Sequence, residues 1–323
     1  MQDLESPDPS TDMTSYIGID VSKNRLDIYA YPCGEISVVD NNKAGHKILN
    51  KWLRQFGRVF IVMEATGKYH RAVARACYAN GHALSVVNPF RSHSFAQCMG
   101  QLAKTDKIDA RMLAIYGQAA RLEPMELAPK SLENLKELVA ARRQIVARKT
   151  TLSHQMEECQ LPFIRKRLKA SLRQAERQVG EFDREIMAMI KDDPNLAERY
   201  AIITSVPGVG PVNAVTMIAD MPELGACNDK EIAALVGVAP MVSQSGTIKG
   251  KGRIRGGRKM VRNALYMAAV SATRYNPTMK AFYGRLRDDG KLFKVAITAV
   301  MRKLIILVNA LIGQNREWTS IAP

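Results

Sequence analysis

The sequence is poor in the residues that build disulfide frameworks and transition-metal sites. Its 5 cysteines are scattered, include no Cys-x-x-Cys pair, and are accompanied by only 5 histidines. Such a set favours neither a disulfide scaffold nor a zinc site, and it is typical of a reducing compartment. Lys, Arg or Gly interrupts the apolar runs before they reach a length that spans a bilayer, so no membrane partner is expected. Residues 1–14 do not resemble a signal peptide and are predicted to be a disordered leader.

Acidic residues are scarce relative to basic ones. The 323 residues contain 47 Lys and Arg against 31 Asp and Glu, which gives a net charge of +16. From Gly246 to the last residue there are 16 basic and 3 acidic residues, so most of this charge lies in the last quarter. A positive field of this size indicates a polyanionic partner, nucleic acid before membrane. We therefore expect a cytoplasmic protein with a nucleic-acid partner.

The first part of the chain, residues 15–125, has the pattern of an α/β domain. Short alternating runs predict strands over 16–20, 26–30 and 35–39, and helical spacing predicts helices over 44–56 and 69–80. The run 58–63 is almost continuously apolar, which is typical of a central strand covered on both faces. A further buried strand is expected over 83–87, followed by a helix that begins near Thr105 or Asp106.

Four carboxylates occupy related places in this pattern. Asp20 ends the first strand and Glu64 ends the apolar strand, while Asp106 and Asp109 lie three residues apart at the start of the last helix. Ligands bind beyond the carboxyl ends of strands in open α/β sheets, so these acids are expected to meet. Carboxylates without His or Cys favour Mg²⁺ over zinc, with Mn²⁺ as an alternative. For an isolated Asp-x-x-Asp, a solvated acidic first turn is the plainer interpretation.

Residues 126–198 predict a long helical arm. Leucine and other apolar residues recur at three- and four-residue steps from Leu132 to Met156, and again from Leu168 to Ile190. The break near Pro162 divides the pattern into two helices, which would form an antiparallel coiled-coil hairpin. A mere spacer is the alternative, but self-association or nucleic-acid contact suits such an arm better.

Residues 199–323 are predicted to form a mainly helical domain that binds nucleic acid. Its opening contains Pro207-Gly-Val-Gly210 between two helical patterns, like the turn of a helix-hairpin-helix, and Gly208 and Gly210 would expose backbone N–H groups to a phosphate. The segment 241–259 is basic and rich in glycine, and further helices are expected over 229–236, 262–275 and 294–313. The basic residues expected to contact nucleic acid are Lys249, Lys251, Arg253, Arg255, Arg258, Lys259 and Arg262.

Several segments together resemble the DEDD insertion-sequence transposases, a family that includes the Piv-type DNA invertases and the bridge-RNA-guided recombinases. The matching amino-terminal segments are Ile17-Gly-Ile-Asp20, Met63-Glu64-Ala-Thr-Gly67, Asn88-Pro89 and Lys104-Thr-Asp106-Lys-Ile-Asp109. The matching carboxy-terminal segments are Pro207-Gly-Val-Gly210, Leu235-Val-Gly-Val-Ala-Pro240, Ser245-Gly246 and Arg262-Asn-Ala-Leu-Tyr-Met267. The resemblance covers nearly the whole chain from Tyr16, in the same order.

The resemblance implies a RuvC-like, ribonuclease-H-like first domain in which the four acids hold magnesium. It also implies that Ser245 attacks a DNA phosphodiester and forms a covalent phosphoserine link, although the residues alone do not favour it over Ser243 or Thr247. Donor and target DNA would be the substrates, a noncoding bridge RNA the guide, and a homodimer assembling into a tetramer the active form. The arm is a plausible dimer contact, because joining two DNA partners requires several active sites.

Three other functions compete with a recombinase. A RuvC-like nuclease would use water in place of the serine and leave nicked products. An actin-like ATPase has a similar first strand but needs a second glycine-rich phosphate loop, which the sequence does not contain in the right context. An inactivated transposase would only hold nucleic acid, and the presence of all four acids and the serine argues against it.

Overall fold

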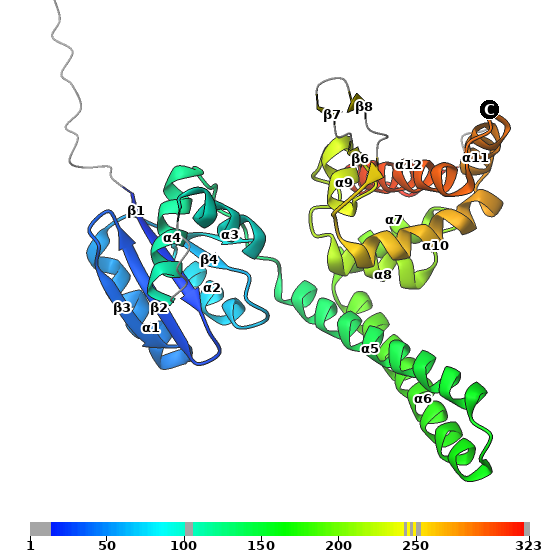
Figure 1. Cartoon of the computed structure of the whole chain (residues 1–323), viewed down its shortest axis with the longest axis horizontal. Coiled ribbons are helices and arrows are strands. Elements are labelled where there is room, and N and C mark those ends of the chain that lie inside the picture. The colour runs from blue at the N-terminus through cyan, green and yellow to red at the C-terminus, as the bar shows by residue number, and fades with distance from the viewer. Residues whose placement is uncertain (1–13, 101–105, 242–243, 246–247, 250–252, 320–323) are drawn as a thin grey trace, which may run out of the picture. The chain divides into compact units, whose positions relative to one another are not determined.

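The computed structural model describes residues 14–100, 106–241, 244–245, 248–249 and 253–319 (Figure 1). The side chains of 106–107 and of 244–249 are not among the described parts, and the expected leader lies almost wholly outside them. The chain divides into two compact units, Met1–Leu127 and Ala128–Pro323. The further division of the second unit into an arm and a carboxy-terminal domain stays a prediction.

Unit 1 is built on a five-stranded sheet with the strand order β3-β2-β1-β4-β5. The strands are β1 (Ser15–Val21), β2 (Arg25–Tyr31), β3 (Ile36–Asp40), β4 (Val59–Glu64) and β5 (Ala83–Val87). The first three form an antiparallel meander, whereas β4 is parallel to β1 and β5 is parallel to β4. The predicted neighbourhood of the first strand and the apolar strand is therefore confirmed: Ile19 of β1 lies opposite Met63 of β4.

Helices cover both faces of this sheet, as the apolar β4 requires. On one face, α1 (Lys43–Leu53) and α2 (His70–Ala79) pack on the alternate residues of β1 and β2, with Leu49 and Leu53 fully buried. The short 3₁₀ helix η1 (Arg54–Phe56) extends α1. On the other face lie α3 (Pro89–Cys98) and α4 (Asp106–Ala119). The two helices pack against each other through the rings of Phe95 and Tyr116, whose centroids are 5.0 Å apart.

Helix α3 was not predicted, because Asn88-Pro89 reads as the end of a strand. The same two residues also start a helix well. Asn88 Oδ1 accepts a hydrogen bond from the backbone N–H of Phe90 at 2.9 Å, and Pro89 occupies the first helical position. Proline costs nothing there, since that N–H has no partner within a helix.

Unit 2 begins with two long helices that pack against each other, α5 (Lys130–Glu158) and α6 (Pro162–Asp192). The predicted break at Pro162 is confirmed. Leu135 and Val139 of α5 and Ile186 and Ile190 of α6 are buried in the core of unit 2, and among the other described residues of the pair only Ala175, in the middle of α6, is buried. Two helices alone cannot shield the apolar side chains between them completely from solvent, so the distal apolar residues stay half-exposed. The coiled-coil geometry stays a prediction.

The core of unit 2 forms around α12 (Phe293–Gly313). Helices α7 (Pro194–Ser205), α9 (Asp229–Val236), α10 (Lys259–Tyr275) and α11 (Pro277–Asp288) contact it, while α8 (Pro211–Asp220) packs against α5, α7 and α10. Contrary to the sequence expectation, α12 is long and apolar enough to cross a membrane by length and composition. Its inner residues, from Ala296 to Leu311, are instead buried in the protein core.

Candidate metal and nucleic-acid sites

One face of the sheet carries the acidic residues at the carboxyl edge of the central strands. In β4, Phe60 and Val62 pack with Leu113 and Tyr116 of α4. Side chains two residues apart on a strand point to the same face, so Glu64, which follows Val62, also lies on the side of α4. This places Glu64 at the end of β4 on the face that α4 covers.

Helix α4 lies directly on β1, and a glycine makes this approach possible. A Cβ added to Gly18 would lie 1.9 Å from the carbonyl oxygen of Ala110, and one added to Gly117 would lie 3.2 Å from the ring of Tyr16. Since Tyr16 precedes Gly18 and Gly117 follows Ala110, the helix runs antiparallel to the strand. The amino end of α4 therefore points toward Asp20, which lies on the same face as Gly18.

The positions of Asp106 and Asp109 follow from this packing. Asp106 is one turn before Ala110, about 5–6 Å further along the helix axis, and Asp20 is about 7 Å beyond Gly18 along the strand. Asp109 directly precedes Ala110. The first turn of α4 is thus at the level of Asp20, as the sequence predicts. The side chain of Asp106 is outside the described parts.

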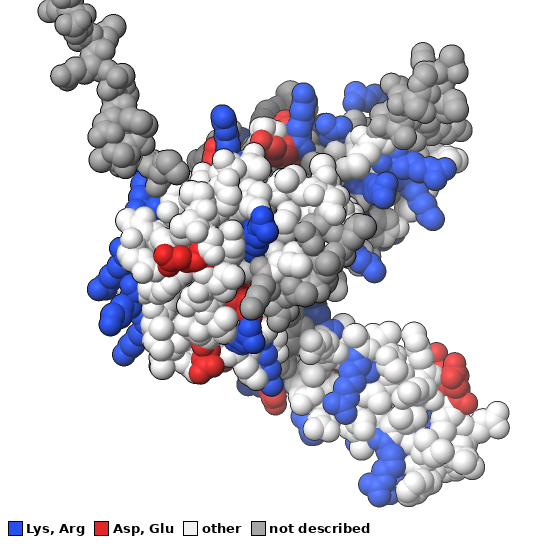
Figure 2. All heavy atoms as spheres, turned by 60° about the vertical axis from the view of Figure 1, so that its left-hand side comes forward, with Lys and Arg blue, Asp and Glu red and all other residues white. Residues whose placement is uncertain are grey.

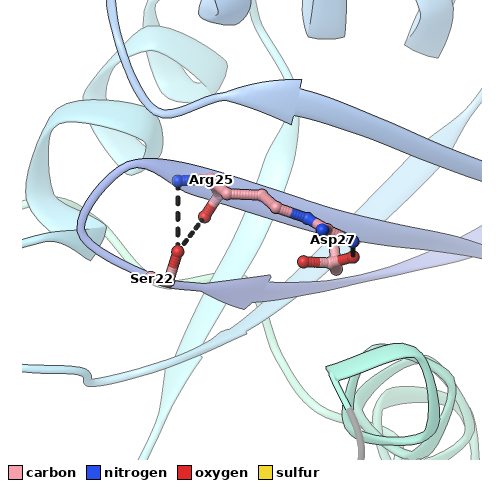
Figure 3. A network of polar contacts seen from close by, with 3 residues as sticks. All are labelled: Ser22, Arg25 and Asp27. Carbon is pink, nitrogen blue, oxygen red and sulfur yellow. Dashed lines mark hydrogen bonds and ion pairs between the residues drawn. The ribbon is translucent and has the colours of Figure 1, made fainter.

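Asp27 is a fifth carboxylate at this edge, and the sequence analysis missed it. It lies directly opposite Asp20 in the β1–β2 ladder, so their Cβ atoms are about 4.5–5.5 Å apart on the same face. Asp27 is only 3% exposed, and the guanidinium of Arg25 donates a hydrogen bond to it at 2.5 Å (Figure 3). The sequence does contain a signal for Asp27: it is a carboxylate inside a strand in which apolar and polar residues are expected to alternate.

The turn between β1 and β2 holds Arg25 in place. Ser22 Oγ donates a hydrogen bond to the carbonyl of Arg25 at 2.8 Å and accepts one from its backbone N–H at 3.1 Å (Figure 3). Because Asp20 precedes this closed turn by two residues, the ends of both strands are fixed together. The guanidinium of Arg25 is therefore held beside the carboxylates at this edge of the sheet.

The donor set at this edge fits a divalent cation of the magnesium type. All candidate ligands are carboxylates, the hard oxygen donors that Mg²⁺ and Mn²⁺ prefer, and adjacent carboxylates repel unless a cation lies between them. Among the described residues, no three Asp, Glu, His or Cys are grouped closely enough to hold a metal ion. The expected cage of Asp20, Glu64, Asp106 and Asp109 stays a prediction.

The predicted nucleophile lies in a small two-strand ladder of unit 2. Gln244–Ser245 (β7) pairs with Ile248–Lys249 (β8) in an antiparallel ladder, so Ser245 lies opposite Ile248. A second short pair joins Pro240–Met241 (β6) to Arg253–Ile254 (β9). The sequence analysis expected only a flexible segment here. The side chains of Ser245 and Lys249, and the whole of Lys251, lie outside the described parts.

The basic residues assigned to nucleic acid fall into two groups. Arg253, Arg255 and Lys259 are exposed. Arg258, in contrast, donates two hydrogen bonds to the carboxylate of Glu223, at 2.5 and 2.6 Å, and one to the carbonyl of Asp220. Its guanidinium links the start of α10 to the end of α8.

The contact between Arg258 and Glu223 shifts the pKa values of both groups. Burial raises the pKa of Glu223, but the hydrogen bonds and the charge of Arg258 outweigh it and hold this pKa below its usual range. The hydrogen bonds that Arg258 donates to Glu223 raise the pKa of Arg258. Arg262 likewise bonds within unit 2, to the carbonyls of Val236 and Gly256. The part of these two arginines in nucleic-acid binding stays a prediction.

The turn between α7 and α8 contains the two glycines expected to bind phosphate. Gly208 has a φ of +99°, and a Cβ there would lie 2.5 Å from the backbone of Ala272 in α10, so close packing explains this glycine. Gly210 faces open space at the amino end of α8. Of the two glycines, only Gly210 has the open space that a bound phosphate needs. Its role in phosphate binding stays a prediction.

The chain is similar to transposases and to a DNA-inverting protein. A family model described as "Transposase" matches residues 17–162, and the model of the "Transposase IS116/IS110/IS902 family" matches residues 200–284. The pilin gene-inverting protein of Moraxella bovis is 30% identical over 321 residues, which cover 94% of this chain and 97% of that protein. The protein of the same name from Moraxella lacunata is 30% identical over 323 residues, with the same coverage.

Solved structures of Thermus thermophilus RuvC also match. One, in complex with a Holliday junction, is 13% identical with a TM-score of 0.28 and covers 35% of this chain and 100% of that chain. The other is 14% identical with a TM-score of 0.26 and has the same coverage.

Proposed function

The chain belongs to the IS116/IS110/IS902 transposase family and is thus a DNA transposase or recombinase, and on this premise we propose how it cuts and rejoins DNA. The nucleophile is Ser245, and the acidic edge of unit 1 supports its attack on a DNA phosphodiester. The observation that carries this proposal is the arrangement of Asp20 and Glu64 on neighbouring parallel strands, with the first turn of α4 at the same level. The similarity to a DNA-inverting protein over 94% of the chain lends further support to a reaction on DNA.

The chemistry is a pair of transesterifications. Ser245 Oγ forms a bond to phosphorus and loses its proton to solvent, while the bond from phosphorus to one deoxyribose oxygen breaks and that oxygen takes up a proton. In the second step a deoxyribose hydroxyl of the other DNA partner attacks the same phosphorus and releases the serine. The covalent link conserves the free energy of the phosphodiester, so rejoining needs no ATP.

The acidic residues have a supporting part in these steps. Asp20, Glu64, Asp106 and Asp109 would hold Mg²⁺, or Mn²⁺ in its place. A cation bound there would stabilise charge on the phosphoryl oxygens and favour loss of the serine proton. The four acids lie in unit 1 and Ser245 in unit 2, so a dimer or tetramer would allow the acids of one copy to act on the serine of another.

The exposed cations of unit 2 suit any phosphate backbone. Arg253, Arg255 and Lys259 would hold donor and target DNA, and a noncoding bridge RNA would select the sites. Removal of RNA from the purified protein is the test of the guide: site-selective cleavage should disappear and return when the RNA is restored. Cleavage that keeps its selectivity without RNA contradicts this part.

The experiment for the mechanism is denaturing electrophoresis of labelled DNA after incubation with the full-length protein and Mg²⁺. The wild-type protein and the control Ser243→Ala should give a protein–DNA adduct, and Ser245→Ala should give neither adduct nor cut. The Asp20→Asn variant should lose the adduct as well. If Ser245→Ala still cuts and leaves free nicked ends, the protein is a hydrolytic nuclease and the proposal is wrong.

A further inference from the structure

A basic groove lies between α1 and α2, on the face of the sheet opposite to α4. Its volume is about 440 Å³, and α2 contributes Ala76 to its lining. Lys43, Lys47 and Lys51 follow one another at four-residue steps along α1, and Arg54 of η1 continues the row. Residues at this spacing share one helix face, so four cations line one wall of the groove.

Within the described part of the chain, no carboxylate lines this groove. Among the described residues, neither the three lysines nor Arg54 forms an ion pair with Asp or Glu. Like charges four residues apart destabilise a helix by about 0.2–0.5 kcal/mol per pair. Burial lowers the pKa of nearby His82, and the charge of Arg54 lowers it further. A bound anion would relieve this repulsion.

The lining of the groove also contains a buried acceptor. Asn50 is only 6% exposed, and its Nδ2 donates a hydrogen bond to the carbonyl of His46 at 2.8 Å. Its Oδ1 is buried and has no hydrogen-bond donor within the described part of the chain. An unsatisfied buried acceptor is unfavourable, so a donor from a ligand or from ligand-bound water would be favoured here.

The lining is otherwise neutral. His46 lies beside Asn50, burial lowers the pKa of its ring, and Nε2 is 2.9 Å from Oδ1 of Asn41. The neutral imidazole adds no charge, so the positive field comes from the row on α1. Figure 2 shows that Lys and Arg side chains gather along one edge of unit 1, where few acidic side chains accompany them.

We propose that this groove binds the sugar–phosphate backbone of a nucleic acid. From Lys43 to Arg54 the row extends about 16 Å, which matches about five phosphates of one strand at 3.4 Å each along a duplex axis. The proposal rests on the proposed function, since a recombinase must hold nucleic acid. It adds a second contact region, on the sheet face opposite to the acidic edge.

The test compares matched double variants of the full-length protein. Lys47→Ala with Lys51→Ala removes two groove cations, and the wild-type protein is the reference. Binding of a labelled DNA duplex and of a labelled RNA strand is measured by fluorescence anisotropy over a range of salt concentrations. Lys47→Arg with Lys51→Arg keeps the charge and should bind like the wild type.

The groove variant should lower the slope of log K against log salt by about 1.8 for duplex DNA, or by about 1.4 for the RNA strand, since each lost phosphate contact contributes 0.9 or 0.7. A loss confined to one probe identifies that nucleic acid as the occupant. If the affinity and the salt slope of the groove variant equal those of the wild-type protein for both probes, the lysine row is a solvated helix face and the proposal is wrong. A wild-type protein that binds neither probe refutes the proposed function itself, whereas Ser245-dependent cleavage with an unaffected groove variant refutes only the groove.

Discussion

The contact between Gly18 and α4 makes a sharp prediction about the acidic edge. In Gly18→Ala the new Cβ would lie 1.9 Å from the carbonyl oxygen of Ala110 and 2.6 Å from the backbone nitrogen of Ala114. Cβ atoms essentially never approach closer than 3.0 Å, so the helix has to withdraw by about 1 Å or more. Both contact atoms are backbone and cannot rotate away. The first turn of α4 would therefore move away from Asp20.

The expected cost has two parts. Overpacking of this kind lowers the free energy of unfolding by about 1–3 kcal/mol. Displacement of groups that position metal ligands typically weakens metal binding by about 10–100-fold. Gly18→Ala should thus lower both the stability of unit 1 and its affinity for Mn²⁺, although it changes no carboxylate.

The two tryptophans allow unit 1 to be followed separately. Trp52 lies in α1, and Trp318 packs against the core of unit 2. Urea unfolding is recorded from Trp52 fluorescence in a Trp318→Phe background, and Mn²⁺ binding by calorimetry. Gly180→Ala in α6 is the control, since a Cβ there meets no atom within 4 Å and should stabilise unit 2 by up to about 1 kcal/mol. An unchanged Trp52 transition and unchanged Mn²⁺ affinity in Gly18→Ala would refute the reasoning.

Three further predictions concern single groups. Asp27→Asn removes one negative charge from the acidic edge and the carboxylate that pairs with Arg25, so Mn²⁺ affinity in calorimetry should fall about tenfold; an unchanged affinity would show that Asp27 has no such part. Because Arg258 keeps the pKa of Glu223 below the usual 4.5, in spite of burial, the pair stabilises unit 2 above that pH and its contribution is lost as the pH falls through the lowered pKa. Urea unfolding of Glu223→Gln should therefore vary less with pH below 4.5 than that of the wild type, and equal pH dependence would contradict this. Burial raises the pKa of Cys77 to about 12, so mass spectrometry after alkylation at mildly alkaline pH should find it unmodified in the folded protein; labelling at the rate of an exposed cysteine would disprove its burial.

The acidic edge could be predicted from local patterns, because strand order follows from them. A continuous apolar run requires a strand covered on both faces, and such a strand lies at the centre of a sheet beside the first strand. Asp20 and Glu64 end these two strands and therefore come together. Two other features also follow from the local sequence. They are the excess of basic residues near the carboxyl terminus and the break of the arm at Pro162.

Other features depend on which surfaces meet in the folded chain. Asp27 joins the acidic edge through strand register and the burial of one sheet face, and Gly18 matters because α4 crosses above it. Arg258 looks like part of a basic loop in the sequence, but the turn that follows α8 provides its carboxylate partner, Glu223, 35 residues away. The lysines of α1 form a groove wall because α2 packs alongside. Periodicity shows which face of an element is buried, whereas the partner of that face is set by packing between segments distant in sequence.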